Sequence, residues 1–343
     1  MKNRFILSAT TAVAIMVNAA EPTVSNVKAR QRYPWNGLVD ITYEVHGIEG
    51  TTNGLECTMA VVMPNSDNAR RASHFWVVQN GENSADREIH ANGNYRLLWD
   101  AQADLGTVKY TNMVVRVNLK ERKKVQLWEG GPYWATTNIG AEEPWEYGYY
   151  FWWGDIVGYT RENNAWVSSD GTSSRFIFSD RITQNTPTYN KDIATLQNEG
   201  WIVLKGGAYI LAPEHDAAHM QWGGGWRMPT YQELSSLERK CDWTWTVMNG
   251  VNGYEVRGRG DYSSNSIFFP CPGYGYSSGL YGAGFHGFYW SSVPKSDNYY
   301  SEVLDFGSDG RNTVVGDGRY DGYSVRPVQE FVEYTNEISG GAR

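Results

Sequence analysis

The chain has few cysteines and no excess of basic residues. The first shortage argues against a structural zinc site, and the second argues against a nucleic-acid-binding surface. Its three cysteines, Cys57, Cys241 and Cys271, lack the paired Cys or Cys/His spacing of a structural zinc site. Cys241 and Cys271 form a possible disulfide, which spacing alone does not establish. The formal net charge is −8, whereas a nucleic-acid-binding domain has a basic face. We therefore expect no metal site and no nucleic-acid partner.

Long apolar runs are also scarce, and the clearest one stands at the N-terminus. Lys2 and Arg4 give a basic start, residues 5–17 are mostly apolar, and residues 17–19 supply a small-residue cleavage site. The apolar stretch is shorter than the roughly 20 residues that span a bilayer. The pattern predicts a signal peptide over residues 1–20, no transmembrane segment, and a secreted or cell-envelope protein.

Tryptophan, tyrosine and glycine are plentiful instead. The chain has Trp 15, Tyr 23 and Gly 37, while charged residues make up only 20%. This composition is typical of chains rich in strands and loops. Trp and Tyr also supply large, stiff contact area for recognition.

Residues 21–125 carry the pattern of a small all-β domain. Apolar and polar residues alternate over residues 39–45 and 113–119, as they do in half-buried strands. Further candidate strands cover residues 57–63 and 95–99, and turn-forming Gly and Asn lie between the strands. Several short strands at this spacing predict an immunoglobulin-like β-sandwich.

Two helices are indicated in the region after residue 125. The first covers residues 213–220 and places His215 and His219 at the i, i+4 spacing of metal ligands, although a structural or surface role is favoured. In the second, Thr230 and Glu233 fit a capping box. One buried stripe follows at Leu234, Leu237 and Cys241.

A series of short blocks in this second region carries a resemblance to a known family. The blocks begin with YWATTNIGA at residues 133–141 and EYGYYFWWG at residues 146–154. They resemble the motifs of the Fibrobacter succinogenes major paralogous domain family. The later blocks follow in the family's order at residues 226–230, 241–246, 249–254, 265–270, 289–292 and 322–328.

The resemblance implies a C-type-lectin-like domain, related to the formylglycine-generating-enzyme and sulfatase-modifying-factor branch. The expected fold class is therefore α+β over residues 126–331, with two helices and small antiparallel sheets, followed by a tail at 332–343. The first and last strands of such a domain pair with each other. Val325 and Val328 would lie in the closing strand, with Arg326 as a buried or half-buried ion-pair partner.

The wider branch includes an oxidase, so catalysis needs a separate test. That chemistry requires a pair of reactive cysteines near the C-terminal part of the domain, and the chain has no cysteine after Cys271. A Gly-x-Ser-x-Gly elbow is also missing. Asp305, Asp309 and Asp317 are read as turn residues rather than as calcium ligands. We expect no enzyme activity, no catalytic residues and no cofactor.

What remains is a recognition surface. Residues 296–323 are rich in Asn, Tyr, Ser, Asp and Gly, the residue types that paratopes use. We predict an exported ligand-binding or adhesion protein whose partner is an unknown surface glycan or protein. A structural or self-assembling envelope protein is the alternative, and an oxidase is the least favoured interpretation. The candidate ligand-binding residues are Asn298, Tyr299, Tyr300, Asp309, Arg311, Asn312, Arg319, Tyr320 and Asp321.

Overall fold

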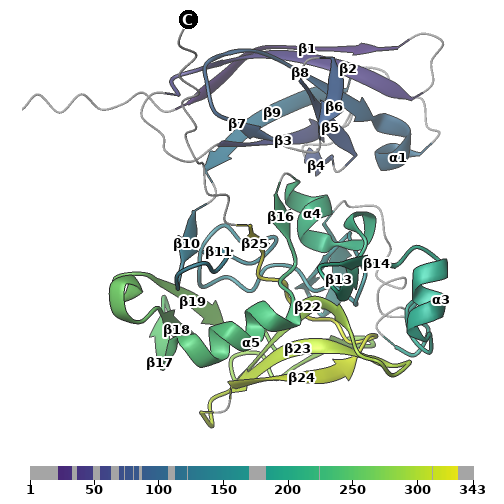
Figure 1. Ribbon diagram of the computed structural model, residues 1–343. Coiled ribbons are helices and arrows are strands. Elements are labelled where there is room, and N and C mark those ends of the chain that lie inside the picture. The colour runs from purple at the N-terminus through teal and green to yellow at the C-terminus, as the bar shows by residue number, and fades with distance from the viewer. Residues whose placement is uncertain are drawn as a thin grey trace, which may run out of the picture.

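The computed structural model has two halves, which Figure 1 shows one above the other. Among the described residues, one hydrophobic core draws its members from the segment before residue 120, and two cores of similar size draw theirs from residues 125–328. The predicted signal peptide (1–20), the tail (332–343) and Arg311 lie outside the described part of the chain. The structure describes residues 22–32, 37–48, 55–62, 69–72, 74–79, 81–84, 87–106, 113–121, 123–169, 183–223, 225–310 and 312–330.

In its described residues the N-terminal half consists of two antiparallel sheets and a short helix, α1 (Ala101–Leu105). The first sheet has the order β1 (Thr23–Gln31), β2 (Leu38–His46), β8 (Gly93–Asp100), β5 (Phe75–Gln79), β6 (Glu82–Ser84). The second has the order β4 (Ala69–Arg71), β3 (Leu55–Val62), β7 (Glu88–Ile89), with β9 (Val114–Glu121) also paired to β3.

The inward-facing side chains of these two sheets pack together in one hydrophobic core. In β2 the odd positions Ile41, Tyr43 and Val45 are buried, because successive residues of a strand point to opposite faces. They share a cluster with Cys57 and Met59 of β3. The Tyr43 hydroxyl lies 3.3 Å from the Cys57 sulfur. The strands predicted over residues 39–45 and 113–119 are therefore confirmed.

The C-terminal half distributes its strands over several small antiparallel sheets. One sheet has the order β10 (Lys124–Gln126), β11 (Tyr133–Ala135), β25 (Val328–Gln329), β16 (Trp226–Arg227). Two sheets have three strands: β17 (Asp242–Met248), β18 (Val251–Arg257), β19 (Ser266–Pro270), and β22 (His286–Pro294), β23 (Tyr300–Gly307), β24 (Asn312–Gly318). The remaining sheets in the described part of this half are pairs: β12 (Tyr159–Glu162) with β13 (Ala165–Ser168), β14 (Ile202–Lys205) with β15 (Ala208–Leu211), and β20 (Tyr274–Tyr276) with β21 (Gly279–Tyr281).

The expected fold class is wrong. The structure is mostly β, with 49% strand against 13% helix, and not a two-helix α+β lectin-like domain. In its described part the C-terminal half has three α-helices, α3 (Ile193–Asn198), α4 (Ala217–Trp222) and α5 (Tyr231–Lys240), among many separate small sheets. α3 escaped prediction because six residues are too few to show a helical stripe.

The two predicted helices had different outcomes. α5 is confirmed, because Thr230 Oγ1 accepts from Glu233 N at 3.3 Å and the Glu233 carboxylate accepts from Thr230 N at 2.7 Å. The helix predicted over residues 213–220 is broken instead. A 3₁₀ turn, η1 (Pro213–His215), ends at Asp216, whose extended backbone (φ −88°, ψ 111°) caps α4.

The break at Asp216 removes the i, i+4 geometry proposed for His215 and His219. His215 stacks on Trp201 with ring centroids 4.0 Å apart, whereas His219 lies on α4. Among the described residues, no group of three or more His, Cys, Asp or Glu side chains is arranged to hold a metal ion.

The expected pairing between the start and the end of the C-terminal half is present, with Trp134 of β11 opposite Val328 of β25, and β10 lies on the other side of β11. Val325 is buried just before β25 rather than within it. Arg326 is also wholly buried, but the expected ion pair is wrong. Its guanidinium donates to three neutral oxygens, Asn138 Oδ1, Ala135 O and Phe268 O, at 2.8–3.1 Å.

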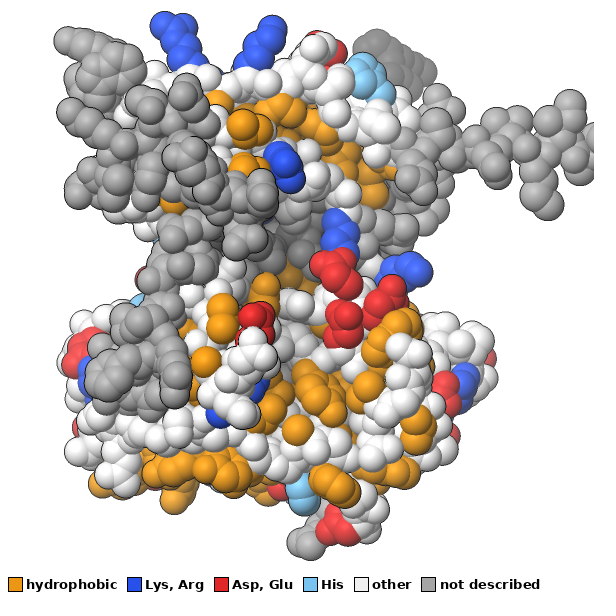
Figure 2. All heavy atoms as spheres, turned by 180° about the vertical axis from the view of Figure 1, so that it is seen from behind, with side chains coloured by type: hydrophobic (Ala, Val, Ile, Leu, Met, Phe, Trp, Pro, Cys, Tyr) orange, Lys and Arg blue, Asp and Glu red, His pale blue; other side chains and the backbone are white. Residues whose placement is uncertain are grey.

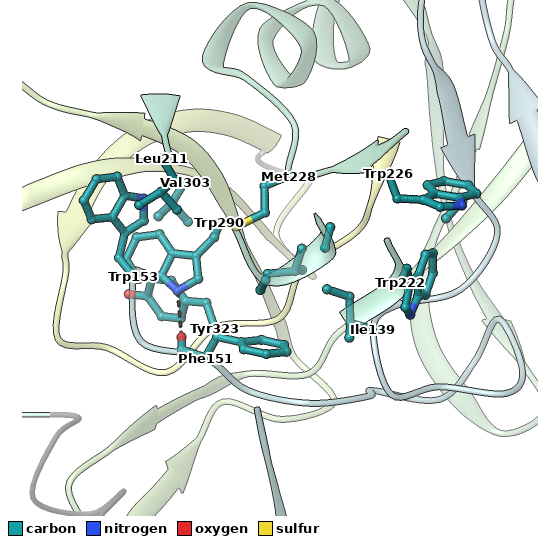
Figure 3. Packing of buried hydrophobic residues seen from close by; sticks show 14 of the residues in the cluster. Ile139, Phe151, Trp153, Leu211, Trp222, Trp226, Met228, Trp290, Val303 and Tyr323 are labelled. Carbon is teal, nitrogen blue, oxygen red and sulfur yellow. Dashed lines mark hydrogen bonds between the residues drawn. The ribbon is translucent and has the colours of Figure 1, made fainter. Parts of the chain in front are cut away.

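Two aromatic-rich clusters form the interior of this half. Figure 3 shows one of them, with Trp153, Trp290 and Tyr323 on one side and Trp222 beside Trp226 on the other. Trp290 Nε1 donates to the Phe151 carbonyl at 2.8 Å. A buried tryptophan N–H usually finds such a partner, and this hydrogen bond ties the segment at Phe151 to β22.

All three cysteines are free and buried. Cys241 and Cys271 pack in one hydrophobic cluster, yet they form no disulfide, so the possible bond is not borne out. No helix in the described part of the chain has the length and apolar character needed to cross a membrane.

Candidate functional site

The candidate residues fall at two opposite ends of the β23–β24 hairpin. Tyr300 of β23 is paired with Gly318 of β24, and Phe306 is paired with Asn312 at the other end. Strands rise about 3.3 Å per residue, so roughly 20 Å separate the two ends. The structure therefore does not bring the predicted set together. Asn298, Tyr299, Tyr300, Arg319, Tyr320 and Asp321 lie at one end, whereas Asp309 and Asn312 lie at the other.

At the first end, tyrosine rings from four segments form a continuous surface group. Tyr189 contacts Tyr299 with ring centroids 5.2 Å apart and Tyr320 at 5.1 Å. Tyr320 in turn lies 5.8 Å from Tyr276. Tyr276 and Tyr299 are 40% and 42% exposed. We call Tyr189, Tyr276, Tyr299 and Tyr320 the tyrosine cluster.

No pattern in the sequence pointed to two members of the cluster. Tyr189 precedes α3, and Tyr276 ends β20. Their contacts with Tyr320 join residues that are far apart along the chain, whereas periodicity reports only local neighbours. Tyr300, 44% exposed, lies beside the cluster at the start of β23.

The aromatic surface continues along β20. Tyr274 and Tyr276 are two residues apart in this strand, so they point to the same face. The Tyr274 ring lies 5.5 Å from Tyr281 and 5.5 Å from Phe288. In Figure 2, seen from behind, side chains of the hydrophobic class, which includes tyrosine, gather on the lower half of the molecule.

Arg319 is the centre of this end of the hairpin, and it is not exposed. Its side chain is wholly buried, and its guanidinium carbon lies 5.3 Å from the Trp153 ring centroid. The guanidinium donates to main-chain carbonyls of Tyr300 (3.0 Å), Lys191 (2.8 Å) and Asp297 (3.0 Å). Burial lowers its pKa to about 10, which leaves it charged at neutral pH. Arg319 is thus an internal support rather than a ligand contact.

These hydrogen bonds tie together the segments that carry the tyrosine cluster. The Arg319 guanidinium also donates to the carbonyl of Thr188, next to Tyr189, and to that of Asn298, next to Tyr299. Its own main-chain N–H donates to the Tyr299 carbonyl at 3.0 Å. Tyr320 is its neighbour in sequence. One planar fork of donors therefore fixes three of the four segments, as only an arginine can.

Two carboxylates lie beneath the tyrosines, and we call Asp317 and Asp321 the acidic pair. Asp321 is only 7% exposed, so it too is not the solvated loop residue that was expected. Burial, together with the nearby Asp317, raises the pKa of Asp321 to about 8. The Tyr323 hydroxyl donates to Asp317 Oδ2 at 2.7 Å.

The cysteines of this half are not poised for reaction. Burial raises the pKa of both Cys241 and Cys271 to about 12. The thiolate, not the thiol, is the nucleophile and the metal ligand. Neither side chain contributes to the surface that carries the tyrosine cluster.

A scan against protein-family models, a search of curated proteins and a search of solved structures each found no match to this chain. The resemblance to the Fibrobacter succinogenes major paralogous domain family therefore stays a prediction.

Proposed function

We propose that this chain is an exported, non-catalytic binding protein that holds a saccharide on the tyrosine cluster. The observation that carries the proposal is the meeting of four tyrosines, from four separate segments, in ring contact at the surface. Aromatic rings of this kind offer stiff, amphipathic contact area at low entropic cost. The C–H faces of a sugar ring can stack on them, while hydroxyl groups meet the neighbouring carboxylates.

The size of the cluster favours a small ligand over a protein partner. A tyrosine presents about 200 Å² of surface, and less than half of each cluster member and of Tyr300 is exposed. The five rings therefore offer roughly 400 Å², whereas one side of a stable protein interface covers about 800 Å².

The buried support from Arg319 favours recognition further. Ordering loops at an interface costs binding free energy, and a surface that is rigid before binding avoids that cost. Here the three segments are already joined by hydrogen bonds to one guanidinium. The backbone that carries the cluster is thus held by hydrogen bonds within the protein itself.

The test is a glycan-array screen with a triple variant that carries Tyr189→Ala, Tyr299→Ala and Tyr320→Ala. We expect the wild type to bind a defined set of saccharides and the variant to lose at least about tenfold in affinity. Its melting temperature should fall by less than about 5 °C, because the rings lie at the surface. Tyr231→Ala is the matched control, since Tyr231 is also exposed (37%) but lies on α5.

Two results would overturn the proposal. One is a triple variant that binds the same saccharides as the wild type with unchanged affinity. The other is an absence of saccharide binding together with concentration-dependent self-association that the triple variant abolishes. The second result would establish the self-assembling alternative.

A further inference from the structure

We infer that the saccharide held on the tyrosine cluster is an amino sugar, whose free ammonium group lies against Tyr274 and Tyr320 and pairs with Asp317 and Asp321. This inference rests on the proposed function and deepens it by naming the ligand class.

The acidic pair and the tyrosine rings flank one glycine at the end of β24. A Cβ atom placed on Gly318 would stand 2.8 Å from the Tyr320 ring and 3.0 Å from Asp321 Oδ2. Asp321 and Asp317 also act electrostatically on both Tyr274 and Tyr320. Ring and carboxylate thus pack against the same glycine, next to each other.

The two carboxylates have no cation of their own in the part of the chain that the structure describes. Gly318 N donates to Asp317 Oδ1, and Tyr323 donates to Asp317 Oδ2 while also facing Asp321. Arg319, the nearest arginine in sequence, is directed to main-chain carbonyls instead. Lys295 lies against Gly316, where an added Cβ would stand 2.8 Å from its Nζ.

A buried carboxylate that no cation balances is unfavourable in its charged form, and such groups in proteins are normally paired with a cation or neutralised by a proton. The remaining groups that face Asp321 are acids or phenols, namely Asp317, Tyr320, Tyr323 and Tyr274. The carboxylate of Asp317 repels a negative charge on Asp321, and the three phenols carry no positive charge that could balance it. A ligand that brings a positive charge therefore completes the site, whereas a neutral or anionic one does not.

The tyrosine rings favour the same ligand class. An ammonium group over the face of an aromatic ring is attracted by the ring quadrupole, and the attraction grows when water is excluded. A neutral sugar can stack on the rings but leaves the acidic pair unmatched. A single amino-sugar unit can stack on the rings and also bring a positive charge to the acidic pair.

The first experiment compares oligomers of glucosamine, N-acetylglucosamine and glucose by calorimetric titration of the full chain. We expect the glucosamine oligomer to bind at least about tenfold more tightly than the other two, because it alone carries the charge. Asp321→Asn should remove this preference while leaving the neutral oligomers unaffected. Glu214→Gln is the matched control, since Glu214 is an exposed acid of η1.

A second experiment uses tetramethylammonium, whose charge does not depend on pH, and neopentyl alcohol as its neutral counterpart. Asp321 is protonated below its pKa of about 8, so the cation should bind about tenfold more tightly at pH 9 than at pH 6. The neutral probe should show no such change. This measurement needs only the wild type and holds even where Asp321→Asn does not fold.

The failure of the inference is distinguishable from that of the proposed function. Equal affinity for charged and N-acetylated oligomers, with binding still lost in the triple tyrosine variant, overturns the amino-sugar assignment alone. Affinity for tetramethylammonium that is the same at pH 6 and pH 9 also overturns it. An absence of binding by every oligomer overturns the proposed function instead.

Discussion

Two wholly buried arginines, Arg326 and Arg319, mark two regions of the C-terminal half that use one physical device for different ends. Each guanidinium donates to neutral oxygens and lies near an aromatic ring, Phe269 at 4.5 Å and Trp153 at 5.3 Å. Burial lowers the pKa of both to about 10. In both regions the charge is stabilised by a full set of hydrogen bonds rather than by an ion pair.

The regions differ in what the hydrogen bonds hold together. Arg326 joins β11, the loop at Asn138 and β19, which are parts of the interior. Arg319 joins the exposed segments that carry the tyrosine cluster. A buried arginine can therefore support either the interior or an aromatic surface, and its acceptors show which.

The largest effect should come from Arg326→Met. Three buried acceptors lose their donor, and each unsatisfied polar group costs about 1–3 kcal/mol. The free energy of unfolding should fall by about 3–5 kcal/mol, as measured by urea denaturation. Arg259→Met is the control, because Arg259 also donates to two carbonyls but has a half-exposed side chain. A smaller loss for Arg326→Met than for Arg259→Met would contradict this account.

Arg319→Lys should affect binding more than it affects stability. Lysine keeps the charge but cannot serve several carbonyls at once, so the three segments should loosen. We expect a loss of about 1–3 kcal/mol in unfolding free energy and a loss of about tenfold or more in saccharide affinity. Calorimetric titration and denaturation on one sample measure both. A large loss of stability with unchanged saccharide affinity would show that Arg319, like Arg326, supports only the interior.

Asp321 gives the Arg319 region a pH dependence. Its pKa rises from an ordinary value of 3.8 to about 8 on folding, so the folded state binds the proton more tightly. This contribution stabilises the protein below pH 4 and is lost as the pH rises towards 8. Asp321→Asn should flatten that part of the stability profile and raise the free energy of unfolding at pH 8 above that of the wild type. Unchanged profiles in wild type and variant would show that Asp321 ionises normally.

The smallest effect on stability should come from Tyr299→Ala. The side chain is 42% exposed, and surface substitutions usually change stability by less than about 0.5 kcal/mol. Saccharide affinity should nonetheless fall by about tenfold. Asp309→Asn, at the opposite end of the hairpin, should change neither quantity. Loss of binding in Asp309→Asn would place the ligand at the end of the hairpin opposite the tyrosine cluster and contradict the proposed site.

Local patterns in the sequence were enough to predict several elements. The alternation of apolar and polar residues predicted β2 and β9, and the Thr230–Glu233 capping box predicted α5. Both signals depend only on neighbours within a few residues. The prediction of one helix over residues 213–220 was wrong because Asp216 interrupts it. The Asp216 carboxylate caps α4 and also accepts a hydrogen bond from Met228 N, twelve residues further along the chain. Short helices and the number of small sheets depend on such distant contacts.

The candidate site was only partly predictable for the same reason. Composition pointed to Tyr299 and Tyr320, but the burial of Arg319 and Asp321 is invisible in a stretch rich in Gly, Asn and Asp, where charged residues are usually solvated. Tyr189 and Tyr276 join the cluster only through the folded chain.

The most direct test of the tyrosine cluster as the binding site is a saccharide titration of the wild type, followed through the ring NMR signals of assigned tyrosines. The ring signals of Tyr189, Tyr299 and Tyr320 should shift together and saturate at one ligand concentration, while those of Tyr231 stay in place. Shifts confined to tyrosines outside the cluster, with these three unmoved, would contradict the account.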